Sequence, residues 1–299
     1  NPLVALNYSS SKVKSRAGNP SFFFKLRSIW FDSSPDNIMK TEKPTALITG
    51  ASSGIGKALC EEFAKDGYHL ILAARSVEKM QAQGAELQRR YGINVTVIAA
   101  DLERVAGAEQ LHAQIKQQGI VLHALVNNAG YGTFGEFKDI DLSATLGMMQ
   151  LNMHSVVVLT KLFLPDLIAT QGKLLNIAST AAFQPGAFFA VYCATKSFVL
   201  YFSEGLACEL EGTGVTVTAL CPGPTASGFQ AKAVMQASAL VKNKKLPSAE
   251  WVAAAGYSAM KRGKRVHIPG VVNTLLALSV RFAPRNWVTA LAKNMTRPI

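Results

Sequence analysis

The feature that most constrains this sequence is a regular alternation of short apolar runs with longer amphipathic stretches. The runs are bounded by Gly, Asn or Asp and have the length of buried parallel strands. They are TALIT (45–49), HLILAA (69–74), NVTVIAA (94–100), VLHALVN (121–127), GKLLNIAS (172–179), GVTVTALC (214–221) and a short RVHI (265–268). Helical period recurs at 56–65, 77–91, 107–118, 142–164 and 194–211. Such alternation predicts an α/β fold, in which one doubly wound domain has a mostly parallel sheet of about seven strands with helices on both faces.

A glycine-rich turn joins the first predicted strand to the first predicted helix. The segment TGASSGIG (49–56) spaces its glycines as G-x-x-x-G-x-G. Glycine lets the backbone approach a pyrophosphate, and the first N–H groups of the helix point toward the phosphate oxygens. Because the turn lies between a strand and a helix, we expect a Rossmann-type dinucleotide site. The cofactor-binding residues expected here are Gly50, Ser52, Ser53, Gly54, Ile55 and Gly56.

The end of the second strand indicates which dinucleotide is bound. An acidic residue there would hold the ribose 2′-hydroxyl of NAD, but this chain has Ala73, Ala74 and then Arg75. A guanidinium group suits a 2′-phosphate, so NADP(H) is favoured over NAD(H). The alternative is that Arg75 is a solvated surface residue. After the third strand, Asp101 and Leu102 are placed to contact the adenine ring, although Asp101 could equally cap a helix.

Further motifs follow in a fixed order along the chain. They are NNAG (127–130), LNMHS (151–155), NIAST (176–180), YCATK (192–196) and CPGPTASGF (221–229). Together with TGASSGIG, this set resembles the short-chain dehydrogenase/reductase family in its compact single-domain form, over nearly all of residues 44–270. In such a fold ligands bind at the carboxyl ends of the strands, where the strand order reverses. Ser179 of NIAST ends the fifth predicted strand and PGPT follows the sixth, so both are expected at this crevice.

The resemblance implies a catalytic set of Asn152, Ser179, Tyr192 and Lys196. Tyr192 would exchange a proton with the substrate oxygen, while Lys196, one helical turn later, would lower the tyrosine pKa and bind the nicotinamide ribose. Ser179 would hydrogen-bond the substrate oxygen, and Asn152 would help to hold a water chain. Taken singly, Ser179 could be only a strand-end cap and Asn152 only a polar helix residue. The further cofactor contacts implied are Asn128, Ala129, Gly130, Pro222, Gly223 and Thr225.

The spacing Tyr-x-x-x-Lys occurs three times, so the pair alone is weak evidence. It is found at Tyr8–Lys12, Tyr192–Lys196 and Tyr257–Lys261. Only Tyr192 has a serine thirteen residues before it, Ser179 at the end of a strand; the same offset from Tyr257 falls on Lys244. We therefore assign the catalytic pair to Tyr192 and Lys196.

The chain divides into three segments by composition. Residues 1–38 are rich in Ser, Asn, Lys and Pro, and we expect an N-terminal extension outside the fold; a targeting role is the alternative. Residues 39–269 are expected to form the NADP-binding catalytic domain, in which the resemblance implies that 224–264 is a substrate lid. Residues 270–299 form a basic amphipathic tail.

The net charge of +12 is concentrated near the C-terminus. Residues 212–299 carry 12 Lys and Arg against Glu250 alone. The tail could lie on an anionic membrane, bind an acidic carrier, cover the active site of a partner subunit or pack on its own domain. Nucleic-acid binding is disfavoured, because the basic residues have aliphatic rather than stacking neighbours.

Apolar side chains surround the predicted substrate site. Phe183, Phe188 and Phe189 lie between Ser179 and Tyr192 in the chain, and the lid adds Phe229, Val234, Met235, Leu240 and Trp251. They favour a hydrophobic substrate, or else pack the protein's own core or an oligomer interface. We predict an NADP(H)-dependent oxidoreductase that interconverts a carbonyl and a secondary alcohol. The alternatives are a 3-oxoacyl reductase acting on a carrier- or CoA-linked chain, and a non-catalytic dinucleotide sensor on the same fold.

The remaining composition bears on metals and location. The four cysteines have no C-x-x-C pair and no metal-ligand spacing with the five histidines, so we expect no metal site and buried free thiols in a reducing cytosol. No transmembrane helix is apparent, since the longest uncharged C-terminal stretch, 266–280, falls short of the ~20 apolar residues of a membrane span. We therefore expect a cytoplasmic enzyme, with peripheral membrane contact an option for the tail. The resemblance implies a homodimer or homotetramer.

Overall fold

The computed structural model describes residues 43–227 and 245–296. The expected extension 1–38, with its Tyr8–Lys12 pair, and most of the expected lid, including Phe229, Val234, Met235 and Leu240, lie outside the described residues. Residues 43–299 form one compact unit.

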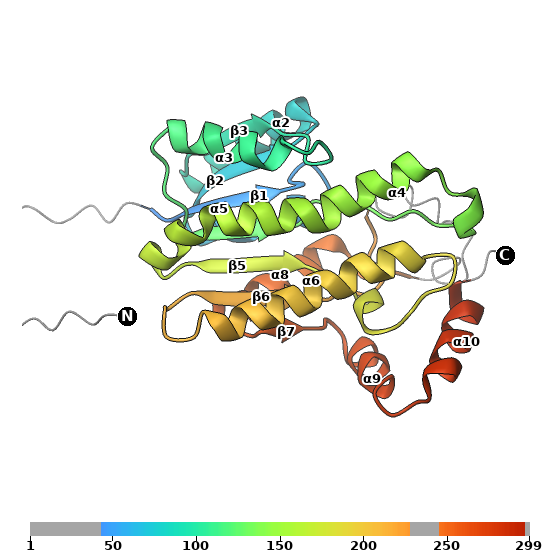
Figure 1. The fold of residues 1–299 in the computed structure, drawn as a ribbon. Coiled ribbons are helices and arrows are strands. Elements are labelled where there is room, and N and C mark those ends of the chain that lie inside the picture. Colours follow the sequence, from blue (N-terminus) through green and yellow to red (C-terminus); the bar gives the residue numbers. More distant parts are fainter. Residues whose placement is uncertain (1–42, 228–244, 297–299) are drawn as a thin grey trace, which may run out of the picture. The chain divides into compact units, whose positions relative to one another are not determined.

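A seven-stranded parallel sheet forms the centre of this unit (Figure 1). Its strands are β1 (Thr45–Thr49), β2 (His69–Ala74), β3 (Val95–Ala99), β4 (Ala124–Asn127), β5 (Lys173–Ile177), β6 (Thr216–Leu220) and β7 (Val266–His267). The spatial order is β3-β2-β1-β4-β5-β6-β7, and every neighbouring pair is parallel. The predicted doubly wound parallel sheet is confirmed. Its order reverses between β1 and β4, which places the crevice at their carboxyl ends.

Helices cover both faces of the sheet. The helices are α1 (Gly54–Lys65), α2 (Val77–Tyr91), α3 (Gly107–Gln117), α4 (Leu142–Met149), α5 (Ser155–Thr170), α6 (Ala190–Glu209), α8 (Ala249–Lys261), α9 (Val271–Ser279) and α10 (Arg285–Thr296). Side chains alternate across β1, so Ala46 and Ile48 pack with α1 and α8, whereas Leu47 packs with α3 and α5. This alternation builds two separate cores, one on each face.

The predicted helix at 142–164 differs from the observed one. Here α4 passes through a π-helical segment (Gln150–His154) into α5, which contains Pro165. By length and apolar composition, residues Leu142–Thr170 could cross a membrane. However, α5 packs against α3, β4 and β5, as a core helix of this domain does. The prediction of buried thiols holds for Cys60, Cys193 and Cys221, whereas Cys208 is exposed.

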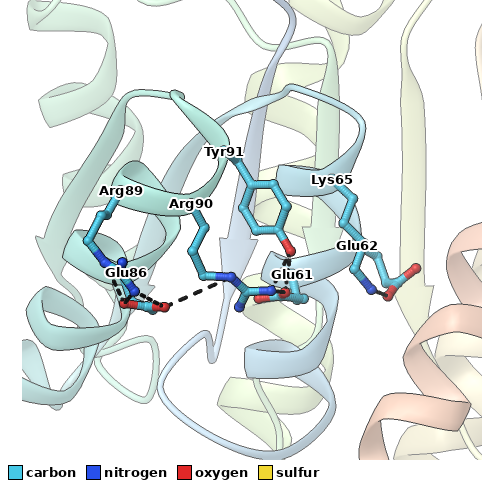
Figure 2. Close-up of polar contacts among 7 residues, drawn as sticks. All are labelled: Glu61, Glu62, Lys65, Glu86, Arg89, Arg90 and Tyr91. Atoms are coloured by element: carbon cyan, nitrogen blue, oxygen red, sulfur yellow. Dashed lines mark hydrogen bonds and ion pairs between the residues drawn. The ribbon is translucent and has the colours of Figure 1, made fainter.

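An exposed network of charges links α1 and α2 (Figure 2). Arg90 on α2 pairs with Glu61 on α1 at 2.7 Å, and the Tyr91 hydroxyl donates a hydrogen bond to the same carboxylate. Arg90 also lies 3.9 Å from Glu86 within α2. Exposed pairs of this kind contribute at most about 1 kcal/mol each. None of these side chains lines the cavity described below, so their role is structural.

Candidate active site

The glycine-rich turn after β1 has a backbone that requires glycine. Gly50 and Gly54 have φ of +66° and +54°, in the left-handed region that side chains disfavour. A Cβ added to Gly56 would overlap the carbonyl oxygen of Gly50 and the side chain of Asn128. The turn therefore leaves a cradle at the N-terminus of α1 that fits a pyrophosphate group.

Asn128 holds this turn in place from β4. Its Nδ2 donates to the carbonyl oxygens of Thr49 at 2.8 Å and Gly50 at 3.3 Å. The Thr49 hydroxyl in turn accepts from the backbone N–H groups of Asn128 and Ala129. NNAG is therefore bonded directly to the glycine turn. Asn128, Ala129 and Gly130 also line the cavity, as expected for cofactor contacts, but the side chain of Asn128 is already engaged by the protein.

Arg75 at the end of β2 has a partner that the sequence does not suggest. Its Nη1 lies 2.8 Å from Oε1 of Glu103, which follows β3. The Arg75 side chain is 53% exposed, so the ion pair is open to water. Asp101 accepts a hydrogen bond from the Glu103 backbone N–H, which caps its own turn and not a helix. Arg75, Asp101 and Leu102 all line the cavity.

Ser179, Tyr192 and Lys196 lie together at the carboxyl end of the sheet. Ser179 lies two positions after the end of β5 and bonds the Tyr192 hydroxyl, which comes from the first turn of α6. One turn later on α6, the Nζ of Lys196 lies 5.8 Å from the centre of the Tyr192 ring. The same Nζ donates to the carbonyl oxygen of Ile177 at 2.7 Å. The three side chains share one wall of the cavity.

Burial dominates the electrostatics of this pair. Desolvation raises the pKa of Tyr192, and the hydrogen bond between Tyr192 and Ser179 only partly opposes it. Desolvation also lowers the pKa of Lys196 to about 8. The sequence-based expectation is that the Lys196 charge lowers the tyrosine pKa. In this structure burial outweighs any such effect, because the phenolate would lie in a site that water barely reaches.

Asn152 lies in the π-helical segment between α4 and α5. Its Nδ2 donates to the Tyr131 carbonyl at 2.9 Å and to the Thr195 hydroxyl at 3.1 Å, and its Oδ1 accepts from the Tyr131 N–H. A Cβ on Gly130 would lie 2.9 Å from this Oδ1 and 3.5 Å from Nζ of Lys196. Asn152 is thus next to the cavity wall, but it does not line the cavity itself.

The loop after β6 completes this wall. The Pro222 carbonyl accepts from the Thr180 N–H at 2.9 Å and from the Ser179 hydroxyl at 3.4 Å. The Thr225 hydroxyl donates to the Gly223 carbonyl at 2.9 Å. Pro222, Gly223 and Thr225 line the cavity, where the resemblance predicts the carboxamide of the nicotinamide. Ser179 is therefore both a strand-end cap, accepting from Ala181 N–H, and a cavity residue.

Comparison with known proteins decides the family. The family model for short chain dehydrogenases matches residues 44–237. The chain belongs to the short-chain dehydrogenase family. This confirms the resemblance inferred from the motifs, and it leaves the substrate and the preferred cofactor as proposals.

Two curated relatives show which enzymes this short-chain dehydrogenase is similar to. It is 38% identical over 183 residues to a very-long-chain 3-oxoacyl-CoA reductase from Anas platyrhynchos, covering 59% of this chain and 58% of that protein. It is 33% identical over 195 residues to the 17-beta-hydroxysteroid dehydrogenase type 3 of Mus musculus, covering 63% and 62%. The chain thus matches less than two thirds of the length of either relative.

A solved structure gives the same result for the fold. A short-chain dehydrogenase from Sphingobium yanoikuyae in complex with NADPH superposes with a TM-score of 0.72 at 30% identity, covering 80% of this chain and 93% of that one. The glycine cradle and the cavity beside it therefore belong to a fold that holds a nicotinamide dinucleotide.

The cavity of this short-chain dehydrogenase has a volume of about 1200 Å³ and extends well beyond the predicted cofactor site. Part of its far wall comes from the C-terminal tail, through Val272, Leu276 and Val280 near α9 and Trp287 and Leu291 on α10. The end of α10 is bonded to the loop before α6, since the Thr296 hydroxyl donates to the Ala187 carbonyl at 2.9 Å. Sequence reasoning did not assign these helices to the cavity. The apolar residues of the tail at helical spacing were the available signal.

The aromatic residues predicted near the substrate lie in different parts of the structure. Phe189 lines the cavity and stacks on Tyr192, with ring centres 4.2 Å apart. Phe183 instead packs against a buried cluster around Val199, and Phe188 lies against Phe134. Trp251 on α8 is half exposed and does not line the cavity. The sequence left two alternatives, a substrate wall and internal packing. Phe189 follows the first, whereas Phe183 and Phe188 follow the second.

The second Tyr-x-x-x-Lys pair of this short-chain dehydrogenase has a structural role. Tyr257 and Lys261 lie on α8 and both bond Oδ2 of Asp66, at 2.7 Å and 2.5 Å. Asp66 ends α1, so the pair fixes α8 to α1. Neither residue lines the cavity. In the described residues no group of three or more His, Cys, Asp or Glu side chains is placed to hold a metal.

Proposed function

We propose that this protein is an NADP(H)-dependent oxidoreductase that interconverts a carbonyl and a secondary alcohol, with Tyr192 as the acid/base group. One observation carries the proposal. Ser179, Tyr192 and Lys196 share a cavity wall with the glycine cradle of a dinucleotide site. A dinucleotide sensor would need the cradle but not this catalytic set, so the sensor alternative is disfavoured.

The nicotinamide, when bound, supplies or accepts the hydride. The hydroxyls of Ser179 and Tyr192 bond each other and both residues line the cavity, so a substrate oxygen bound there would accept from both. Tyr192 gives its proton to that oxygen as negative charge develops there. Because burial raises the Tyr192 pKa, the phenol is neutral at physiological pH and is ready to donate. In this protonation state Tyr192 can act as the acid that reduction of a carbonyl requires.

Lys196 and Asn152 position the reacting groups. The Lys196 ammonium has one proton committed to Ile177 and others free to bond the ribose hydroxyls of a bound cofactor. The free-energy cost of burying the Lys196 ammonium falls when the ribose oxygens of the cofactor accept hydrogen bonds from it. Cofactor binding therefore stabilises the charged form of Lys196. Asn152 orders the Tyr131 backbone and the Thr195 hydroxyl behind this site. Its expected part in a water chain stays a prediction.

NADP(H) is supported over NAD(H) by the charges at the end of β2. Arg75 and Lys79 line the cavity, and Lys79 lies in the first turn of α2. The two positive charges and the N-terminus of the helix all favour an anionic phosphate. Glu103 opposes this, because a 2′-phosphate must share or replace the carboxylate that Arg75 now binds. The comparison structure from S. yanoikuyae was solved with NADPH.

The substrate that fits best is an apolar ketone or its alcohol. The cavity beyond Tyr192 is walled by Phe189 and by aliphatic and aromatic residues of α9 and α10. The names of the two relatives, a 3-oxoacyl-CoA reductase and a hydroxysteroid dehydrogenase, agree with such a wall. A 3-oxoacyl reductase is the second candidate, because Lys245 lines the same cavity and could bind a phosphate of a CoA or carrier arm.

A substrate panel tests the proposal. The purified chain is assayed with NADPH and NADH against a long-chain 3-oxoacyl-CoA, a steroid ketone, an aromatic ketone and a small polar ketone. We expect NADPH to be preferred and the apolar ketones to be reduced far more efficiently than the polar one. Preference for the polar ketone would contradict the substrate assignment, and equal use of both cofactors would contradict the role of Arg75. Cytoplasmic location and a homodimer or homotetramer stay predictions.

A further inference from the structure

Helix α9 presents apolar side chains on two opposite sides. Val272, Leu276, Ala277 and Val280 line the cavity. The opposite side carries Val271, Leu275 and Leu278, and the turn after the helix continues the same side with Phe282; these are 76%, 61%, 45% and 88% exposed. The spacing of i, i+4, i+7 and i+11 places them in one stripe along the helix. We call this stripe of four residues the outer stripe.

The outer stripe has no partner within the described residues, and its exposure is costly in water. A cluster of large apolar side chains marks an interaction surface, whereas scattered ones do not. Two more exposed side chains, Trp287 at 73% and Leu291 at 60%, lie on α10 and also line the cavity. They are therefore at its rim. The outer stripe and the apolar residues that line the cavity thus lie on opposite sides of α9.

The charged residues of the segment 270–296 are all basic. Arg281, Arg285 and Lys293 are exposed, and none forms an ion pair with a carboxylate of the described residues. The chain from 251 to 299 contains no Asp or Glu at all. A second copy of this face would therefore bring like charges together. An anionic surface would neutralise them.

An apolar helix that is followed directly by an aromatic side chain and by cations has features of an interfacial membrane segment. Aromatic residues such as Phe282 and Trp287 favour the boundary between headgroups and acyl chains. An acidic carrier would pair with the cations but would leave the four apolar side chains in water. A lipid surface accommodates both features at once.

We propose that α9 and the turn that follows it dock on the surface of an anionic lipid bilayer, with the outer stripe buried at the acyl boundary and Arg281 and Arg285 against the headgroups. In this arrangement the exposed rim residues Trp287 and Leu291 would offer a lipophilic ketone a route from the membrane into the cavity. The docking itself does not depend on the proposed reaction; only the route of substrate entry does.

Vesicle co-sedimentation of the full chain tests the docking. Vesicles of phosphatidylcholine are compared with vesicles that also contain phosphatidylglycerol, at low and high salt. We expect the protein to pellet with the anionic vesicles and to be released by salt. The double variant Leu275→Glu/Phe282→Glu should lose at least tenfold in binding. Arg281→Gln/Arg285→Gln should lose the preference for anionic lipid.

The matched control is Val105→Glu, which adds a charge at a side chain that is 71% exposed but lies before α3. It should bind like the wild type, and circular dichroism should show that all variants fold. Equal pelleting of the wild type and the stripe variant, no pelleting of either, or equal pelleting with neutral and anionic vesicles would overturn the proposal. Self-association that is lost in the stripe variant, measured by light scattering without lipid, would assign the stripe to a second copy instead. Reduction of a water-soluble ketone, measured in parallel, reports on the reaction separately.

Discussion

Lys196 lies with its Nζ 5.8 Å from the centre of the Tyr192 ring, and both side chains are almost fully buried. The ammonium donates to the carbonyl oxygen of Ile177, which fixes its position beside the tyrosine ring. Because neither side chain is well solvated, the charge state of each depends strongly on what occupies the cavity.

The burial of Lys196 should appear in the pH dependence of stability. Its pKa is lowered by burial from 10.5 to about 8, so between these values the unfolded chain holds more protons on Lys196 than the folded chain does. Stability must then rise with pH across this window. Urea unfolding at several pH values should show the wild type gaining up to roughly 3 kcal/mol relative to Lys196→Met from pH 8 to 10.5. A difference that stays constant with pH would mean that Lys196 is charged throughout.

The ion pair of Arg75 with Glu103 should tune cofactor preference. Glu103→Gln frees the guanidinium, and because an exposed pair is worth at most about 1 kcal/mol, 2′,5′-ADP should bind roughly threefold to fivefold more tightly. Arg75→Gln should weaken its binding at least tenfold, on the order of the loss of a charge-assisted pair. Titration calorimetry measures both, with 5′-AMP as the control ligand, whose affinity should stay constant. Weaker binding of 2′,5′-ADP by Glu103→Gln would show that the carboxylate positions Arg75 and does not compete for it.

The second tyrosine–lysine pair should affect stability and not catalysis. Tyr257→Phe removes the hydroxyl that donates to Asp66 at 2.7 Å, and this should cost about 1 kcal/mol in urea unfolding. Lys261 still holds Asp66, so α8 should remain in place. Ketone reduction per folded molecule should equal that of the wild type. A large loss of activity in a folded variant would contradict the assignment of the two pairs.

Two glycine-to-alanine changes should affect different properties: one should weaken NADPH binding and the other should stabilise the fold. Gly56→Ala places a Cβ against the backbone of Gly50, so the cradle must open and NADPH binding should fall at least tenfold. Gly205→Ala lies on an exposed turn of α6 with no atom within 4 Å of the new Cβ. It should stabilise the fold by roughly 0.5–1 kcal/mol without any effect on binding. Intrinsic fluorescence quenching by NADPH and thermal unfolding check the two results. Unchanged NADPH affinity in Gly56→Ala would show that the turn is not the phosphate site.

The sequence predicts the fold well because its signals are local. Each buried strand is a short apolar run, and the glycine turn follows β1 directly, so topology and crevice can be inferred from neighbouring residues. The family motifs then predict that Ser179 and Tyr192 meet, although they lie thirteen positions apart in the chain. Both residues are indeed bonded to each other at the cavity.

The rest depends on contacts between distant segments. Nothing in the sequence pairs Arg75 with Glu103, because their approach requires β2 and β3 to end side by side. The contribution of α9 and α10 to the cavity wall could not be predicted from the sequence either. The tail has apolar residues on several sides, and periodicity alone does not say which side faces the cavity. The opposing effects of burial on Tyr192 and Lys196 also depend on the folded environment.

The account depends most on Tyr192 as the acid/base group, and Tyr192→Phe tests this directly. The substitution removes only the hydroxyl that bonds Ser179, so the ring can keep its stack on Phe189 and NADPH should still bind, as fluorescence quenching will show. Single-turnover hydride transfer from NADPH to an apolar ketone, followed by loss of absorbance, should then slow by a factor of at least 10²–10⁴ relative to both wild type and Tyr257→Phe. Hydride transfer at the wild-type rate in a Tyr192→Phe variant that binds NADPH normally would contradict the central claim.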